Sequence, residues 1–600
     1  MSSIPVIGVD TETGLFGRGR MAPPLVCMST SNRDLARHDD KNSIFRFWEG
    51  ARSKEFSIVG HNFAYDTAVF CAAYSDLIPI IFDVYRIGIH DTMIRQMLLD
   101  LKDTGLCRPR SLADLSSLWI GETLDKGSDT WRKRYYDLRD VAIADWPENA
   151  RTYAIKDALM SYSVFLEQGS GASPADVFDN EFDRTRAHFA YKLMATYGLK
   201  TDVEYVEKHI HDGERLLDEL ASNLQAAGIM KPGTRSITKN QIIKRLEASG
   251  IVLPETEKGN KQIDKTILAL SDDLEIKNYA QFKSTQHELK NYLYKYRDGL
   301  VQCDSNPLLT NGRLSLSRPP LQNLPRSGAV RESFIARPGK VLCSVDYEGV
   351  ELRTLAQAEL WLTGRSKLAQ VFQQDAKADV HTMLAATLLR IPLDEAYRRK
   401  KEDPTFKSYR QKMKAANFGF GGGMGPDKFV LTQKKSGLTF TVAEAHEIKQ
   451  AYLRQWDLTS YFNYANRTAQ KGFMKCLVSN RYRATSVFTD HANGYFSSLM
   501  ADGSAAAMFE IVRQQYAVPS SPIYGTRLVC AVHDESLTEL DKDGAHEQAY
   551  VIRDIMCNTM MSKYTPDVPI TAEPALMLRW NKDATEEFDK TGRLIPWEKK

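Results

Sequence analysis

Two acidic residues in the second half of the chain, each beside an apolar run, have the chemistry to hold divalent metal ions. Asp346 follows the run VLCSV, which predicts a strand that ends at this acid. Asp534 lies in VHDES, between the strand-like runs RLVCAV and LTEL, which predicts the turn of a hairpin. Mg²⁺ binds proteins through one or two carboxylates together with substrate phosphates. Two ions roughly 3.5–4 Å apart would suit displacement at phosphorus, because one activates a hydroxyl and the other stabilises the leaving oxygen.

A basic and aromatic stripe lies between these two acids in the sequence. Arg410, Lys414 and Phe418 recur at every fourth position, and residues 408–420 contain no proline and only one glycine, which predicts a helix. Residues at this spacing share one helical face, and Arg and Lys bind phosphate oxygens. Alone, the stripe would be a solvated basic face with one core aromatic. The glycines at 421–423 follow a helix rather than a strand, which excludes a dinucleotide-binding fingerprint.

A second acidic set lies near the amino terminus. PVIGVDTETG predicts a strand that presents Asp10 and Glu12 on the same side, because alternate residues of a strand share a face. IVGHNFAYD contributes Asp66. RTYAIKDAL contributes Tyr153 and Asp157, one helical turn apart, so that the phenol and the carboxylate can converge.

The three clusters of the second half resemble motifs A, B and C of the A-family DNA polymerases, in the same order. The stretch TNGRLSLSRPPLQNLP, residues 310–325, is similar to the TGRLSS…PNLQNIP segment of that family. The resemblance covers nearly the whole chain. It implies a DNA-templated DNA polymerase that extends a primer with dNTPs in DNA replication. The compact layout of the chain is similar to that of phage enzymes.

The resemblance also implies roles for matching residues. Asp346 and Asp534 would bind two Mg²⁺ ions, with Mn²⁺ as an alternative, and Glu351 would be the steric gate against a ribose 2′-hydroxyl. Further implied residues are Tyr347 for metal binding, Glu535 for catalysis, Arg410, Lys414, Phe418 and His381 for dNTP binding, and Arg313, Gln322, Asn323, His533 and Arg481 for primer-template DNA.

The chain departs from the family pattern at several positions. Glu348-Gly349 stand where Ser-Gln is usual, and Gly422 stands where a Tyr is frequent. Asp502 replaces a common Gln, and Gly494 falls where an Arg is usual. These departures affect contacts expected with the minor groove and the template base, and leave the metal-binding acids intact.

The amino-terminal acids resemble the Exo I, Exo II and Exo III motifs of DEDD exonucleases, in the tyrosine variant. By that resemblance a 3′–5′ proofreading site would act on single-stranded 3′ ends. The implied residues are Asp10, Glu12, Asp66 and Asp157 for two metal ions, and Tyr153 for orienting the attacking water. Asp91, in HDT, is interpreted as structural.

The length of 600 residues predicts several domains. We expect an α+β multidomain chain, with a ribonuclease H-like α/β exonuclease domain followed by a right-hand polymerase domain. The stretch GSGASPAD predicts a linker, because small residues and proline interrupt two periodic segments. The expected boundaries are 1–168 for the exonuclease, 169–185 for the linker and 186–600 for the polymerase, with the thumb at about 186–305, the palm at about 306–360 and 455–600, and the fingers at about 361–454.

Composition excludes some classes of protein. With 79 basic and 76 acidic residues the net charge is only +3, so DNA binding requires local asymmetry, which Arg313, Arg318, Arg326 and Arg331 could provide. Eight cysteines without a C-x-x-C pair argue against a zinc site and for a reducing compartment. No apolar run approaches the roughly 20 residues of a membrane span, and no leader is recognisable. A cytoplasmic protein is expected, in the host cytoplasm if phage-encoded.

Two other functions remain open at this point. The chain could be an exonuclease whose second half only binds DNA, although Asp346, Asp534, Arg410 and Lys414 are all retained. It could also be a single-subunit RNA polymerase, although Glu351 and the exonuclease motifs argue against that function. Primer extension with deoxynucleotides or ribonucleotides distinguishes the three.

Overall fold

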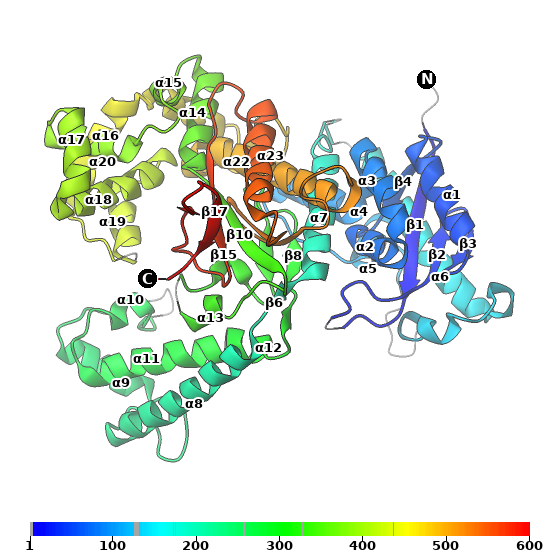
Figure 1. Cartoon of the computed structure of the whole chain (residues 1–600), viewed down its shortest axis with the longest axis horizontal. Helices are drawn as coiled ribbons and strands as arrows, with labels where there is room; N and C mark the ends of the chain where they lie inside the picture. The colour runs from blue at the N-terminus through cyan, green and yellow to red at the C-terminus, as the bar shows by residue number, and fades with distance from the viewer. Residues whose placement is uncertain are drawn as a thin grey trace.

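The computed structural model describes residues 4–17, 19–124, 131–171, 173–174, 176–255, 259–326, 328–435 and 437–599. The amino-terminal part, blue to cyan in Figure 1, lies at one end of the molecule, and the remainder consists of a central sheet and two helical lobes. The predicted α+β multidomain class is confirmed. Among the described residues, no helix combines the length and the apolarity needed to cross a membrane.

The amino-terminal domain is built on a five-stranded sheet of order β3-β2-β1-β4-β5. The central strand β1 pairs antiparallel with β2 and parallel with β4. The strands are β1 (Val6–Thr13), β2 (Leu25–Thr30), β3 (Leu35–Arg37), β4 (Ser57–Gly60) and β5 (His90–Asp91). The helices are α1 (Lys41–Arg52), α2 (Ala64–Ala73), α3 (Ile78–Ile87), α4 (Thr92–Thr104), α5 (Leu112–Ile120) and α6 (Glu148–Ser170). This mixed, helix-covered sheet is the predicted α/β exonuclease layout.

Helix α6 lies unusually close to strand β1. A Cβ atom at Gly8 would collide with the carbonyl oxygen of Ala158, so only glycine allows this approach. The Ser29 hydroxyl, on β2, donates to the carbonyl oxygen of Ala154 at 2.8 Å and holds the same helix. The acids of α6 are thereby brought to the acids of β1.

Helix α7 (Glu181–Tyr197) joins the amino-terminal domain to the rest of the molecule. It begins inside the predicted linker 169–185, of which Ala172 and Ala175 lie outside the described residues. Its first residue, Glu181, is buried and accepts hydrogen bonds from Arg95 at 2.8 Å and from the Asp91 amide at 3.1 Å. The second part of that segment is therefore a packed helix start and not a free connection.

The lower helical lobe of Figure 1 corresponds to the expected thumb. Its long helices α8 and α11 pack along each other. The lobe leaves and returns through the antiparallel pair β6 (Leu199–Lys200) and β7 (Leu300–Val301). Its helices are α8 (Val203–Ala226), α9 (Lys239–Ala248), α10 (Lys265–Leu268), α11 (Leu274–Glu288) and α12 (Tyr294–Tyr296).

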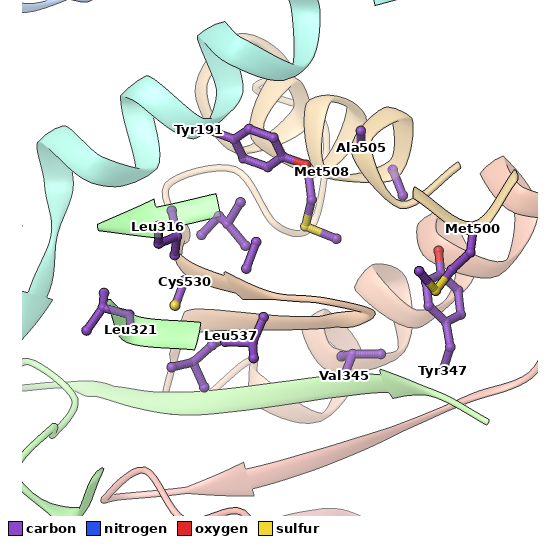
Figure 2. Packing of buried hydrophobic residues seen from close by; sticks show 14 of the residues in the cluster. Tyr191, Leu316, Leu321, Val345, Tyr347, Met500, Ala505, Met508, Cys530 and Leu537 are labelled. Carbon is purple, nitrogen blue, oxygen red and sulfur yellow. The ribbon is translucent and has the colours of Figure 1, made fainter. Parts of the chain in front are cut away.

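The central sheet has the order β13-β14-β10-β15-β17-β16. Its strands are β10 (Lys340–Tyr347), β13 (Arg527–Val532), β14 (Glu535–Asp541), β15 (Ala572–Met577), β16 (Glu587–Phe588) and β17 (Leu594–Trp597), and the helices α22 (Phe488–Ala517) and α23 (Ala545–Lys563) accompany it. Figure 2 shows part of the core around this sheet, where Leu537 and Cys530 of the strands belong to the same apolar cluster as Met508 of α22 and Tyr191 of α7. The hairpin β13–β14 is thus held by apolar contacts.

The short elements β8 (Asp304–Asn306), β9 (Ser315–Ser317) and α13 (Ala329–Glu332) precede the central sheet, and Leu316 and Leu321 of this region join the same core (Figure 2). The pair β11 (Phe473–Lys475) and β12 (Tyr482–Ala484) precedes α22.

The upper helical lobe of Figure 1 corresponds to the expected fingers. The helix predicted over 408–420 is confirmed as part of α18, which Asp403 caps and Pro404 begins. The helices of this region are α14 (Val350–Thr363), α15 (Lys367–Gln374), α16 (Val380–Leu389), α17 (Leu393–Glu402), α18 (Pro404–Gly421), α19 (Pro426–Lys435), α20 (Val442–Trp456) and α21 (Thr459–Ala469).

Candidate functional site

The two acids of the second half meet at one end of the central sheet. Strand β10 pairs with β14 in a register that sets Asp346 opposite Glu535. The hairpin turn predicted at Asp534 is present: strands β13 and β14 close with Val532 opposite Glu535, so His533 and Asp534 form a two-residue turn. His533 has the positive φ of 57° that such a turn requires. One acid therefore comes from a strand end and the other from a hairpin tip.

The charges at this site favour a bound cation. Burial and the charge of Asp346 raise the pKa of Asp534 to about 7. Burial also raises the pKa of Asp346 above its ordinary value. Two carboxylates that resist ionising together are stabilised by a hard cation with oxygen ligands, so this donor set fits a divalent metal. Among the described residues, no group of three or more His, Cys, Asp or Glu side chains is gathered in an arrangement that could hold a metal ion.

Lys582 lies among the acids of this site, although the sequence motifs do not indicate it. Its Nζ donates to Asp346 Oδ2 at 3.1 Å and to Glu535 Oε2 at 2.7 Å. It lies in the loop after β15, where no spacing pattern links it to either acid. Glu535 itself is buried and also accepts a hydrogen bond from the Ser344 hydroxyl.

The expected sugar gate lies beside the expected DNA contacts. Glu351 is in the first turn of α14 and forms an ion pair with Arg313, both side chains being about one-third exposed. Arg313, Gln322 and His533 line one small pocket at the sheet end. Gln322 is held there because its Nε2 donates to the Ala531 carbonyl oxygen at 3.2 Å. Asn323 follows it on the surface, so the structure brings these predicted residues together.

Residues of helix α18, in the expected fingers, form the other part of the candidate site. Arg410 donates to both carboxylate oxygens of Asp379 at 2.9 Å, and Lys400 donates to the same acid at 2.8 Å. Burial alone would raise the pKa of Asp379, but these hydrogen bonds hold it below its ordinary value. Lys414 and Phe418, on the same face of α18, are exposed and line an open groove. Arg410 is therefore held by a counter-ion, whereas Lys414 faces solvent.

His381 is oriented by a short chain of hydrogen bonds. Its Nδ1 lies 3.0 Å from Asn417 Nδ2, and Asn417 Oδ1 accepts from Trp456 Nε1 at 3.1 Å. Burial and the neighbouring charge of Arg410 lower the pKa of His381 to about 4, so the ring is neutral near pH 7. The centroid of the His381 ring is 5.7 Å from that of Phe418, so the two rings are neighbours.

Arg481 does not lie where a direct DNA contact requires it. Its side chain is fully buried and donates to Asp502 Oδ1 at 2.9 Å and to Asn180 Oδ1 at 2.7 Å. Arg184 of α7 pairs with the same oxygen of Asp502. The expectation for Arg481 is corrected: it connects α7 to α22 and has no path to the surface.

The Tyr347 side chain is likewise directed away from solvent. Its hydroxyl donates to the Met556 carbonyl oxygen at 3.0 Å, and Figure 2 shows it beside Met500. The phenol therefore cannot serve as a metal ligand, and only the main-chain oxygen of Tyr347 remains for the role that the sequence predicts.

The amino-terminal acids form a separate site. Asp10 and Glu12 are on β1, and Asp66 of α2 accepts from the Thr11 amide at 3.1 Å. Burial, followed by the charges of Asp66, Asp157 and Glu12, raises the pKa of Asp10 well above its ordinary value. Burial raises the pKa of Asp66 to about 7. The four predicted acids thus share one electrostatic field, which suits divalent cations.

Tyr153 and Asp91 both lie near the amino-terminal acids but make different contacts. Tyr153 is on α6 one turn before Asp157, as predicted, and its ring lies 6.0 Å from that of Tyr135. Asp91 accepts from the Asn62 and Phe63 amides at 3.1 and 2.9 Å and caps α4. The structural interpretation of Asp91 is confirmed.

Comparison with known proteins identifies the family of each part of the chain. Residues 199–582 match the model of DNA polymerase family A, and residues 1–167 match that of a 3′-5′ exonuclease. The DNA polymerase I of Aquifex aeolicus is 24% identical over 571 residues, which cover 88% of each chain. The thermostable DNA polymerase I of Thermus filiformis is 27% identical over 322 residues, 51% of this chain and 35% of that protein.

A solved structure shares the fold. It is the POL domain of Pol1 from M. smegmatis in complex with DNA primer-template and dNTP, with a TM-score of 0.69, 15% identity and 96% of each chain covered. The chain thus spans about a third of one curated relative and most of another.

Proposed function

The chain belongs to DNA polymerase family A and carries a 3′–5′ exonuclease domain ahead of its polymerase domain, and we propose that it extends a primer 3′ end with dNTPs on a DNA template. The observation that carries this proposal is the meeting of Asp346 and Asp534 at the sheet end, with Lys414 of α18 near enough for its charge to act on Asp346. Paired acids facing a basic helix suit a triphosphate substrate.

Each residue of the polymerase site has a proposed task. Asp346 and Asp534 would hold two divalent cations, with Mg²⁺ expected and Mn²⁺ as an alternative. When bound, such ions activate a hydroxyl and stabilise a leaving oxygen. Lys414 binds the triphosphate, and Arg410 joins it by exchanging Asp379 for a phosphate. Phe418 packs against the sugar, with neutral His381 beside it.

Primer and template bind along the neighbouring surface. Arg313, Gln322 and His533 converge in one pocket beside Asp534, and Asn323 adds an exposed amide. Guanidinium and amide groups donate to phosphate and base-edge acceptors, and these contacts position a duplex.

The amino-terminal site is proposed to remove nucleotides from a single-stranded 3′ end. Asp10, Glu12, Asp66 and Asp157 would hold the cations, and Tyr153 would orient the attacking water. The mutual effect of these acids on their pKa values supports this role. Removal of a mispaired end would make the second activity a proofreading one.

Primer extension on a recessed 3′ end tests the proposal directly. With Mg²⁺ and dNTPs we expect template-directed products, and in the absence of dNTPs we expect shortening from the 3′ end. Preferential use of ribonucleotides would instead identify an RNA polymerase. Shortening without extension would identify an exonuclease with a DNA-binding module.

Glu351→Ala is expected to relax sugar selection. The carboxylate, held by Arg313, would occupy the space beside C2′, and alanine leaves that space open to a ribose hydroxyl. We expect the ratio of kcat/KM for a ribonucleotide to that for its deoxynucleotide to rise by about tenfold or more, about 1.4 kcal/mol. Glu348→Ala, which removes the same charge three residues earlier, is the matched control. An unchanged ratio in Glu351→Ala would refute the gate.

Phe418→Tyr is expected to weaken discrimination against dideoxynucleotides. The Phe418 ring offers no hydrogen bond to replace a missing 3′-hydroxyl, whereas a tyrosine hydroxyl could supply one. We expect the dideoxy-to-deoxy incorporation ratio to rise by about tenfold or more. Phe473→Tyr, at an exposed ring on β11, is the control. Should the ratio stay constant while stability falls, Phe418 would only pack the fingers.

A further inference from the structure

Lys582 places a cation inside the acidic polymerase site. Its Nζ lies between Asp346 Oδ2, at 3.1 Å, and Glu535 Oε2, at 2.7 Å. The loop that carries it is fixed by Trp580, which is fully buried and whose amide donates to the Phe334 carbonyl oxygen at 2.9 Å. The backbone of this loop therefore holds Lys582 at the site.

The two carboxylates that Lys582 contacts are unequal. Glu535 has a side chain only 2% exposed and the shorter contact, and it also accepts the Ser344 hydroxyl. Asp346 has a side chain 44% exposed and the longer contact. A buried ion pair is costly to break, whereas a solvated one is weak. Lys582 is thus anchored on Glu535 and reaches from there to Asp346.

The Lys582 ammonium group and a bound divalent cation would have the same effect on the charge of Asp346. Both would neutralise Asp346, and two positive charges next to one carboxylate oxygen repel each other. A lysine with a flexible stem can swing away from Asp346 while its contact with Glu535 persists.

We propose that Lys582 is a built-in counter-ion, which neutralises Asp346 in the metal-free protein and releases it, while staying on Glu535, when a divalent cation binds. This inference rests on the proposed function, because it takes Asp346 as a metal ligand. The lysine lowers the metal affinity of the site. In the metal-free protein its positive charge reduces the repulsion between Asp346, Asp534 and Glu535. A purely structural lysine would hold the same strands together without affecting metal binding.

The test measures Mn²⁺ binding to the full chain without DNA, by the electron paramagnetic resonance signal of free Mn²⁺. All variants carry Asp10→Ala and Glu12→Ala, which remove two of the four acids of the other site. Lys582→Gln is expected to bind Mn²⁺ about tenfold more tightly, equivalent to about 1.4 kcal/mol. Without metal it should unfold at a lower temperature, and Mn²⁺ should raise that temperature by more than in the parent.

Two further variants control for loss of charge and for folding. Lys582→Arg keeps the charge and should bind Mn²⁺ as the parent does. Lys340→Gln removes a lysine that pairs with Asp541 at the other end of β10 and β14, and should leave Mn²⁺ affinity unchanged. Unchanged or weaker Mn²⁺ binding in folded Lys582→Gln would overturn the counter-ion role.

Primer extension by the unmodified chain is measured separately. If extension fails while Lys582→Gln still tightens Mn²⁺ binding, the proposed function is wrong and the counter-ion role stands. If extension succeeds and the Mn²⁺ affinity does not increase, only the counter-ion role is wrong.

Discussion

Asp534→Ala is expected to abolish primer extension while the chain continues to shorten single-stranded 3′ ends. The substitution removes the acid at the tip of β13–β14 and leaves Asp346, at the end of β10, with Lys582 as its counter-ion. We expect extension to fall by at least about 10³-fold, or about 4 kcal/mol in activation free energy. The measurement is single-turnover extension of a labelled primer beside degradation of the same strand without template.

The reciprocal variant and a matched control complete that experiment. Asp10→Ala with Glu12→Ala should eliminate shortening and preserve extension, because the two sites lie on separate sheets. Asp543→Ala removes an exposed acid just beyond the same β14 strand and should change neither activity. If Asp534→Ala abolished both activities in a folded protein, the assignment of two independent sites would fail.

Local sequence patterns predicted the parts of the site that local rules determine. The strand-like runs RLVCAV and LTEL placed Asp534 in the turn of a hairpin, and the structure closes that hairpin around His533 and Asp534. The spacing of Arg410, Lys414 and Phe418 predicted a helix, and α18 places them on one face. Periodicity decides such elements because each is specified within a few residues.

The partners of charged side chains could not be predicted in the same way. Arg481 meets Asn180, about 300 residues earlier in the chain, and Lys582 meets Asp346 across 236 residues. Nothing in the neighbourhood of either residue encodes those distances. The sequence therefore favours a DNA-contacting position for Arg481 and gives no indication of Lys582. Only the packing of α7 against α22, and of the loop after β15 against the sheet, creates these contacts.

The stretch GSGASPAD accounts for only the first part of the predicted linker 169–185. GSGASPAD has the small residues and proline of a loop, yet the residues directly after it enter a packed region. Glu181 is buried against Arg95 and His90, and this ion pair fixes the start of α7 to the amino-terminal domain. In a free connection Glu181 would be exposed. In this structure it is buried and fixes the first turn of α7.

Asp502→Ala is expected to destabilise the folded protein strongly. Asp502 replaces the Gln that is common in the family, and its buried carboxylate accepts from both Arg184 and Arg481. Burial and the charge of Arg481 lower the pKa of Arg184 to about 10, which reflects two like charges held together. Alanine would leave both guanidinium groups buried without an anion, at a cost of about 3–5 kcal/mol in the free energy of unfolding.

Urea unfolding followed by circular dichroism measures this cost, and two variants separate charge from packing. Asp502→Asn keeps an acceptor oxygen and loses the charge, so its loss should be large but smaller than that of Asp502→Ala. Asp490→Ala removes an acid of the same helix α22 that pairs with Arg483 at a partly exposed position, and should cost about 1 kcal/mol or less. If Asp502→Ala behaved like Asp490→Ala, the contact between α7 and α22 would depend on its apolar residues, and the buried ion cluster would contribute little to holding the two domains together.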